Sequence, residues 1–188
     1  MKILTILAHP SKDSFNHALL RQYIKGTKQN HQVKTIYLGD LKFDPILHEG
    51  YKKIQTLEPD LLDAQKKILW ADKITIFTPI WWTTPPALFK GFIERTLHPT
   101  FAFNNPSGNK YEKLLKGRNA RIIATMDAPL LYYKFIVGDP LYKQMKGTLS
   151  FCGISPIQKT YISSLKFKTN KQTNEILKQI YKVGLNEK

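Results

Sequence analysis

Short apolar runs alternate along this chain with amphipathic stretches of helical period, and this alternation constrains the fold more than any other feature. The runs cover residues 3–8, 33–38, 73–81, 120–126 and 156–163. The first, third and fourth are almost continuously apolar, which is typical of strands covered on both faces in a parallel sheet. The sequence therefore predicts a doubly wound α/β sheet with right-handed crossovers, formed by a single domain over residues 1–188.

Helical periodicity fills most of the intervals between these runs. The helical stretches are residues 14–28, 58–73, 85–97 and 169–184. Ser14 is placed to cap the first of them, and Pro59 suits the first turn of the second. The positions expected to be buried in the second stretch are Leu61, Leu62, Ile68 and Leu69. Residues 39–57 and 127–140 break the alternation, and connections of that length are often functional.

The composition is that of an ordinary globular chain. Of the 188 residues, 42% are hydrophobic, which is enough for a sizeable core. The single cysteine, Cys152, has no partner for an internal disulfide, so we expect a buried thiol in a reducing compartment. The N-terminal sequence MKILTILAHP lacks a small-residue cleavage site, and no apolar run approaches the roughly 20 residues that span a bilayer. We therefore expect a cytoplasmic protein that does not cross a membrane.

The formal net charge of +15 is compatible with nucleic acid, a membrane surface or anionic small molecules as partners. The lysines are scattered, with some crowding after residue 158, and no arginine-rich block or basic–aromatic ladder marks a nucleic-acid site. Two interpretations remain, namely a lysine-rich solvated surface and a positive field that attracts phosphorylated cofactors. Neither has nucleic acid as a partner.

In an open α/β sheet, ligands bind outside the carboxyl ends of the strands where the strand order reverses, so the loops there should hold the chemistry. After the first strand, Ser11, Asp13 and Ser14 lead into a helix whose first N–H groups and positive dipole end suit a phosphate. His9 would donate to the same anion, and Asn16 would fix the loop. The alternative is that Ser14 only caps the helix and His9 is an ordinary turn residue.

The loop after the third strand, PIWWTTPP, contains two adjacent tryptophans between prolines. Pro79 lacks an N–H where the strand leaves the sheet, so the amides that follow should be available to a ligand. These are the amides of Ile80, Trp81, Trp82 and Thr83. A flat heteroaromatic ring with acceptors along one edge suits such a row, with an indole packed beside it. Alternatively, the tryptophans anchor the core or form a dimer surface.

The loop after the fourth strand would supply a second wall for such a ring. Asp127, Ala128 and Pro129 form a turn that is followed by two leucines and then by Tyr132 and Tyr133. A ring held between the third and fourth loops would contact this turn. Either tyrosine would offer a phenol to a substrate, unless the pair serves only in packing.

Two motifs together resemble a known family. The stretches AHPSKDSFNHAL and PIWWTTPPALFKGFIERTLHPTFAF are similar to the flavodoxin-like NAD(P)H:quinone oxidoreductases, and the resemblance extends over essentially the whole chain. It implies a flavodoxin-like five-stranded parallel sheet in the order 2-1-3-4-5, flanked by helices. The residues that it implies around a flavin phosphate and ribityl chain are His9, Ser14, Phe15, Asn16 and Ala18. Those that it implies along the isoalloxazine ring are Pro79, Ile80, Trp81 and Trp82.

The fourth loop departs from this family, whose members often have a Thr-Thr-Gly-Gly run there. This chain has Thr125, Met126, Asp127, Ala128 and Pro129 instead. Loss of the glycines changes the shape of a loop that approaches a cofactor. We expect Met126, Asp127 and Ala128 to contact the cofactor, and we assign no pair of residues to a proton relay.

The resemblance implies FMN or FAD as the cofactor, NAD(P)H as the co-substrate and a quinone or similar acceptor, in a ping-pong cycle whose chemistry the flavin carries out. The short chain favours FMN. A homodimer with its active site at the subunit interface is also implied, which would explain exposed aromatic residues such as Trp82, Phe101, Phe103 and Tyr132. Tyr132 is the one side chain placed in a catalytic role, and no metal is expected.

Three alternatives are compatible with parts of the sequence. A flavin-binding regulatory subunit, for example of a cation-efflux system, would have the same site without enzymatic activity. A basic nucleic-acid-binding module would bind nucleic acid in a salt-dependent way and would bind no flavin. A serine hydrolase would use Ser14, His9 and Asp127, although the sequence has no G-x-S-x-G elbow.

Overall fold

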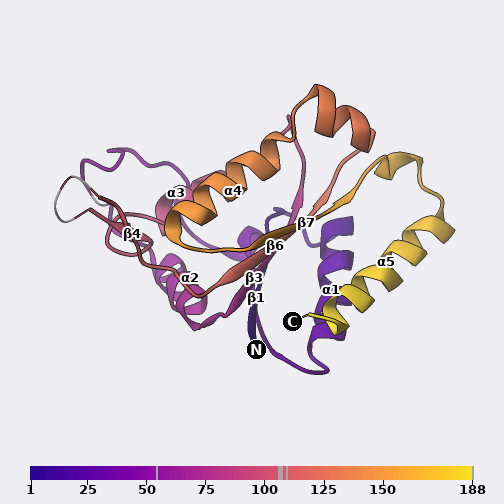
Figure 1. Cartoon of the computed structure of the whole chain (residues 1–188), viewed down its shortest axis with the longest axis horizontal. Coiled ribbons are helices and arrows are strands. Elements are labelled where there is room, and N and C mark those ends of the chain that lie inside the picture. Colours follow the sequence, from indigo (N-terminus) through magenta and orange to yellow (C-terminus); the bar gives the residue numbers. More distant parts are fainter. Residues whose placement is uncertain (54, 106–107, 109, 188) are drawn as a thin grey trace.

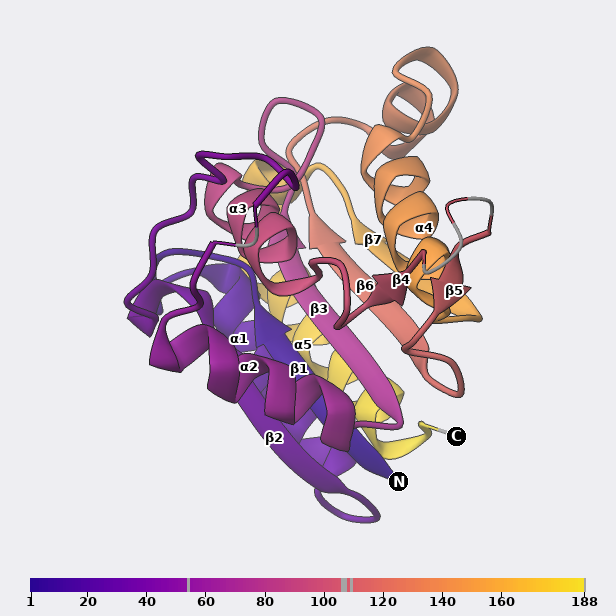
Figure 2. The same cartoon turned by 90° about the vertical axis from the view of Figure 1, so that its left-hand side faces the viewer.

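The computed structural model describes residues 1–53, 55–105, 108 and 110–187. Five parallel strands form one sheet (Figure 1), and their order β2-β1-β3-β6-β7 can be followed in Figure 2. These strands are β1 (Lys2–Leu7), β2 (Gln32–Tyr37), β3 (Lys73–Pro79), β6 (Asn119–Thr125) and β7 (Ile157–Ile162). The arrangement confirms the doubly wound sheet and the order 2-1-3-4-5, counted over the strands of this sheet.

Burial on both faces explains why the central strands are almost continuously apolar. Every residue of β3 is buried, as is every residue of β1 except the first. β2 and β7 lie at the edges of the sheet and are only partly covered. A sheet whose central strands are buried and whose edge strands are half-exposed needs helices on both of its faces.

Two helical layers cover the sheet. On one face lie α1 (Phe15–Thr27) and α5 (Asn170–Leu185), and on the other lie α2 (Pro59–Trp70), α3 (Ala87–Thr96) and α4 (Pro140–Cys152) (Figure 2). Ser14 caps α1 as predicted, because its hydroxyl oxygen accepts the N–H of His17. Within the described residues, no helix is both long enough and apolar enough to cross a bilayer.

Two leucines of α2 were wrongly expected to be buried. Leu62 and Leu69 are 46% and 52% exposed. Successive residues of an α-helix point about 100° apart, so two neighbouring leucines cannot both face the sheet. Leu61 and Ile68 take the inward positions. Cys152 is buried as expected, and burial raises the pKa of its thiol to about 11.

Several elements have no counterpart among the predicted ones. α4 buries only a narrow stripe between the exposed Lys143 and Lys146, so its apolar period is weak in the sequence. β4 (Phe103–Asn104) and β5 (Glu112–Lys113) form a short antiparallel ladder outside the main sheet. Three short helical turns lie in the connections, namely η1 (Leu38–Asp40), the π-helix η2 (Tyr132–Ile136) and η3 (Leu165–Phe167).

The long connection between β2 and α2 is held against α3 by a buried arginine. Arg95 is 1% exposed, and its Nη2 donates to Glu58 Oε2 and to the Thr56 carbonyl, each at 2.9 Å. Gly91 permits the close approach, because a Cβ at that position would lie 2.5 Å from the Pro45 carbonyl oxygen. The break in the alternation before α2 is therefore an anchored connection.

A buried group of charges lies near the amino ends of β3 and β6. The Glu187 carboxylate pairs with Lys73 Nζ and with Arg121 Nε, the latter at 2.6 Å. The Tyr23 hydroxyl donates to the same carboxylate at 3.0 Å. Burial opposes ionisation of Glu187, but the two cations outweigh burial and hold its pKa below the ordinary value. This cluster ties the segment after α5 to the sheet.

Glu187→Gln should destabilise the fold by about 3 to 5 kcal/mol at pH 7, because it removes the carboxylate from a buried ion pair. Denaturant unfolding followed by circular dichroism measures the loss. The loss should shrink as the pH falls from 4.5, the ordinary value for Glu, through the lowered pKa of Glu187. In that range the wild-type carboxylate also becomes protonated in the folded state, and its contribution disappears.

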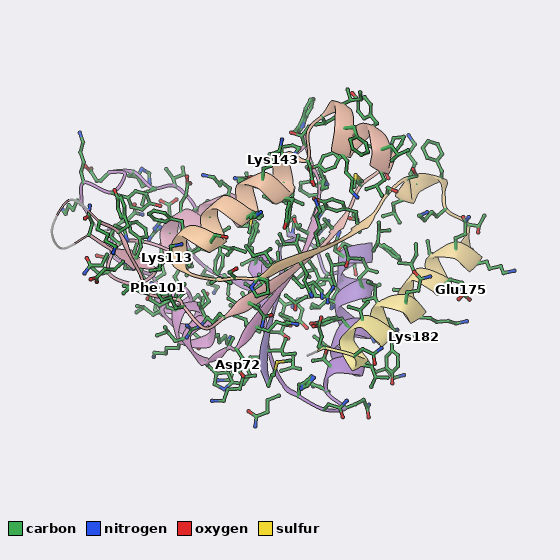
Figure 3. All side chains as sticks on the ribbon, in the orientation of Figure 1. Asp72, Phe101, Lys113, Lys143, Glu175 and Lys182 are labelled. Atoms are coloured by element: carbon green, nitrogen blue, oxygen red, sulfur yellow. The ribbon has the colours of Figure 1, made fainter. Side chains whose placement is uncertain are left out.

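Glu175→Gln is the matched control. Glu175 lies on the outer side of α5 (Figure 3), where it pairs with Lys178 at 3.0 Å while remaining 54% exposed. Surface pairs of this kind contribute roughly 0 to 1 kcal/mol. If both variants lost the same small amount of stability, the buried cluster would have no special role in the fold.

Candidate functional site

A cavity of about 400 Å³ lies at the carboxyl ends of β1, β3 and β6. Its wall is formed by the loops after these strands and by the start of η3, which follows β7. The wall residues are His9, Ser11, Asp13, Ser14, Phe15, Asn16, Pro79, Ile80, Trp81, Thr125, Met126, Asp127 and Leu165. The cavity is therefore at the switch point between β1 and β3, where the strand order predicts a ligand site.

The first loop presents a neutral His9 ring to the cavity. Its Nδ1 lies 2.9 Å from the Ser11 amide nitrogen and 3.0 Å from the Ser11 carbonyl oxygen, so the Ser11 backbone holds this ring nitrogen in either tautomer. Burial lowers the pKa of His9 below its ordinary value, against a smaller opposing effect of the hydrogen bond to the Ser11 backbone. The ring therefore lines the cavity without a positive charge near pH 7.

The first turn of α1 leaves backbone donors unpaired. The Ser14 carbonyl accepts the N–H groups of His17 and Ala18. The amides of Phe15 and Asn16 donate to no other described residue, and both residues line the cavity. Unpaired N–H groups at the positive end of a 13-residue helix favour an anion such as phosphate.

Asn16 adds a buried polar atom without a partner. Its side chain is 3% exposed, and Nδ2 donates to the Thr125 hydroxyl at 2.8 Å. Oδ1 accepts no hydrogen bond from the residues that the structure describes. Because buried polar atoms are seldom left unpaired, a ligand hydroxyl or N–H in the cavity would complete this site.

Two of the third-loop amides expected to face a ligand are already used. The Ile80 N–H donates to the Thr125 carbonyl at 2.8 Å, and the Trp81 N–H donates to the Thr84 carbonyl at 2.9 Å. The expectation was wrong for these two amides, because bonding to β6 continues past the end of β3 and a tight turn follows. The next two amides, those of Trp82 and Thr83, donate to no described residue.

The two tryptophans have opposite surroundings. The turn between Trp81 and Thr84 places Trp82 and Thr83 at φ values of 48° and 71°. Trp81 lines the cavity, and its ring lies edge-on to His9 with the centroids 5.3 Å apart. Trp82 is 98% exposed and lies outside the wall. Trp81 is therefore the indole that a ring ligand in the cavity would meet.

The fourth loop is braced by the segment after β7. The Leu165 N–H donates to the Met126 carbonyl at 3.1 Å, and the Lys166 N–H donates to Asp127 Oδ1 at 3.0 Å. These bonds bring Leu165 into the cavity wall. Leu165 was not predicted, although the carboxyl end of a fifth parallel strand was bound to lie at the same edge of the sheet.

Some residues predicted for the site lie outside the cavity wall. These are Ala18, Trp82, Thr83, Ala128 and Tyr132. Tyr132 is 53% exposed on η2, whereas its neighbour Tyr133 is 2% exposed. Phe101 and Phe103, expected to be exposed, are half-buried and pack against the core near the β4–β5 hairpin; Phe101 is labelled there in Figure 3.

The geometry of the first loop is not that of a catalytic triad. Ser14 Oγ donates to the Ser11 carbonyl at 3.0 Å, so its hydrogen is directed away from His9. Asp127 accepts the Lys166 N–H, and His9 Nδ1 is hydrogen-bonded to the Ser11 backbone. A triad requires a hydrogen-bonded chain from serine through histidine to a carboxylate, and these side chains are committed to other partners.

Comparison with known proteins agrees with this architecture. The family model Flavodoxin_2, which describes a flavodoxin-like fold, matches residues 1–183. The chain belongs to this family.

This flavodoxin-like protein is similar to two relatives and one solved structure in particular. It is 30% identical over 166 residues to an uncharacterized NAD(P)H oxidoreductase of Haemophilus influenzae, covering 84% of the chain and 81% of that protein. It is 30% identical over 181 residues to ribosyldihydronicotinamide dehydrogenase [quinone] of Homo sapiens, covering 81% and 77%. The crystal structure of Smu.1420 from Streptococcus mutans UA159 is 29% identical and gives a TM-score of 0.86, with 100% of both chains covered. The flavodoxin-like chain is therefore a homologue of NAD(P)H and quinone oxidoreductases.

An NMR titration should show that His9 of this flavodoxin-like protein is neutral at pH 7. Because burial lowers its pKa, the ring should titrate below 6.5, the ordinary value for His. Nitrogen chemical shifts follow the titration, and the His9→Ala variant assigns the signal. A midpoint at or above 6.5 would contradict the burial of this ring.

Proposed function

We propose that this protein is a flavin-dependent oxidoreductase that takes hydride from NAD(P)H and passes electrons to a quinone or a similar acceptor. One observation carries the proposal: unpaired N–H groups of a helix start and the indole of Trp81 line the same cavity at the switch point. That combination suits a ligand with a phosphate at one end and an aromatic ring at the other. Homology to NAD(P)H and quinone oxidoreductases supports the same activity.

The described residues fit the two ends of FMN. The groups proposed to hold the phosphate and ribityl chain are the His9 ring, the amides of Phe15 and Asn16, and Asn16 Oδ1, with Ser14 and Ala18 supporting them at the start of α1. The residues proposed to hold the ring are Pro79, Ile80, Trp81 and Met126, with Leu165 from η3.

When bound, the flavin supplies the hydride and electron transfer, with NAD(P)H and the acceptor using one site in turn. The role proposed for the chain itself is to orient the flavin and to polarise it. We propose that the unpaired amides of Trp82 and Thr83 and the net charge of +15 favour negative charge on the ring. Ser14 acts as a helix cap and not as a nucleophile. Tyr132, exposed on η2, is proposed to contact the acceptor.

We infer a homodimer from the exposed apolar side chains on and beside η2 and in the third loop. The exposed apolar side chains there are Leu131 at 69%, Phe135 at 77% and Ile136 at 74%, and Trp82 in the third loop is 98% exposed. Single exposed apolar residues are ordinary, but several on one short helix favour a surface covered by a second copy.

Reconstitution with FMN, followed by anaerobic addition of NADH or NADPH, tests the function. We expect FMN to bind with a shift of its visible absorption, one of the two nicotinamides to bleach that absorption, and a quinone to restore it. If neither FMN nor FAD binds, the proposal is wrong. If a flavin binds but neither nicotinamide bleaches it, the regulatory alternative replaces the enzyme.

Trp81→Ala should weaken FMN binding by about tenfold or more, because it removes the aromatic surface against the ring. The melting temperature of the flavin-free protein should change little, since Trp81 is already 45% exposed. Trp70→Ala is the matched control, because Trp70 is partly buried on α2 and lies outside the cavity wall. It should lower the melting temperature without weakening FMN binding. The reverse pattern would make Trp81 a core anchor.

A further inference from the structure

The turn that carries the two tryptophans is strained. Trp82 and Thr83 both have positive φ, at 48° and 71°, and hydrogen bonds between Trp81 and Thr84 close the turn at 2.9 and 3.1 Å. This is the pattern of a type I′ turn, whose two central positions normally hold Asn and Gly. A bulky residue and a β-branched residue there are disfavoured, so contacts outside the turn must hold the conformation.

Tyr133 provides such a contact. Its hydroxyl donates to the Thr83 carbonyl at 2.7 Å and accepts the Leu141 N–H at 3.1 Å. The side chain is 2% exposed, and burial raises the pKa of its phenol. The hydroxyl is therefore protonated at neutral pH and has both of its hydrogen bonds fixed.

The tyrosine is itself held in place by a partly buried network. The Asp139 N–H donates to the Tyr133 carbonyl at 3.1 Å. The Asp139 carboxylate accepts hydrogen bonds from Lys159 Nζ and from the Tyr161 hydroxyl. The Tyr161 ring packs edge-on against Tyr133, with the centroids 5.8 Å apart. Support thus runs from the edge strand β7, past the end of β6, to the turn that follows β3.

We propose that Tyr133 is a positioning residue whose hydroxyl holds the Trp82–Thr83 turn in its left-handed conformation. Held in this way, the turn keeps Trp81 in the cavity wall and leaves the amides of Trp82 and Thr83 unpaired. The consequence for ligand binding rests on the proposed flavin function. The consequence for the turn itself does not, and can be measured without flavin.

Hydrogen exchange of the Thr84 amide in the flavin-free protein tests the turn. This amide donates to the Trp81 carbonyl, so its protection reports whether the turn is closed. We expect Tyr133→Phe to accelerate its exchange by about tenfold, the effect of losing one hydrogen bond. Tyr142→Phe is the matched control, because the Tyr142 hydroxyl also donates to a backbone carbonyl, that of Ile157, at 3.2 Å. Equal exchange in the two variants would overturn the proposal.

FMN titration of the same variants tests the consequence. Tyr133→Phe should weaken FMN binding by about tenfold, and Tyr142→Phe should not. Adding Thr83→Gly to the Tyr133→Phe variant should restore affinity, because glycine adopts positive φ without strain. A general loss of packing would not be rescued in this way, so failure of the rescue contradicts the proposal.

Tyr161→Phe covers the case in which the Tyr133 variant does not fold. It keeps the Tyr133 hydroxyl but removes one donor to Asp139, and should accelerate Thr84 exchange in the same direction by a smaller factor. Unchanged exchange would contradict the support from β7. If the wild-type protein bound no flavin, the proposed function would fail, while Thr84 exchange would still decide the role of Tyr133.

Discussion

Parallel pairing of β1, β3 and β6 is the constraint on which the rest of this structure depends. Parallel strands need crossovers, and each crossover helix returns the chain to the amino edge of the sheet. The loops that leave the strands therefore gather at the other edge. The reversal of strand order between β1 and β3 opens a cavity there. His9 and Trp81, distant in the chain, come into ring contact because of this topology.

The local sequence pattern was sufficient to predict an element where the element's own residues determine its structure. Burial on both faces demands continuous apolar runs, so the central strands were predictable, and Ser14 marked the start of α1 because capping involves only its own turn. Local pattern failed where distant segments decide. The Ile80 amide is taken by Thr125, and Leu165 enters the wall through its bond to Met126. The hydrophobic periodicity of either segment gives no information about these hydrogen bonds to a distant segment.

The adjacent tryptophans show how backbone conformation separates two identical side chains. Bonding to β6 fixes the chain up to Ile80, and the closed turn reverses it before Thr84. Between these points Trp81 stays against the cavity and Trp82 is carried into solvent. The conformation that separates them is one that neither Trp82 nor Thr83 favours by itself, so the fold around the turn imposes it.

The two edges of the sheet differ in how completely their polar groups are paired. Near the amino edge, the Glu187 carboxylate is bonded to Lys73, Arg121 and Tyr23. At the carboxyl edge, Asn16 Oδ1 and the first amides of α1 have no partner among the described residues. Unpaired polar groups cost free energy in the native state. A ligand that pairs with them removes the cost, so its binding and the stabilisation of the native state are one free-energy change. The unpaired amides at this edge therefore favour an anionic ligand, and Asn16 Oδ1 favours one that also carries a hydrogen-bond donor, as we propose for the flavin.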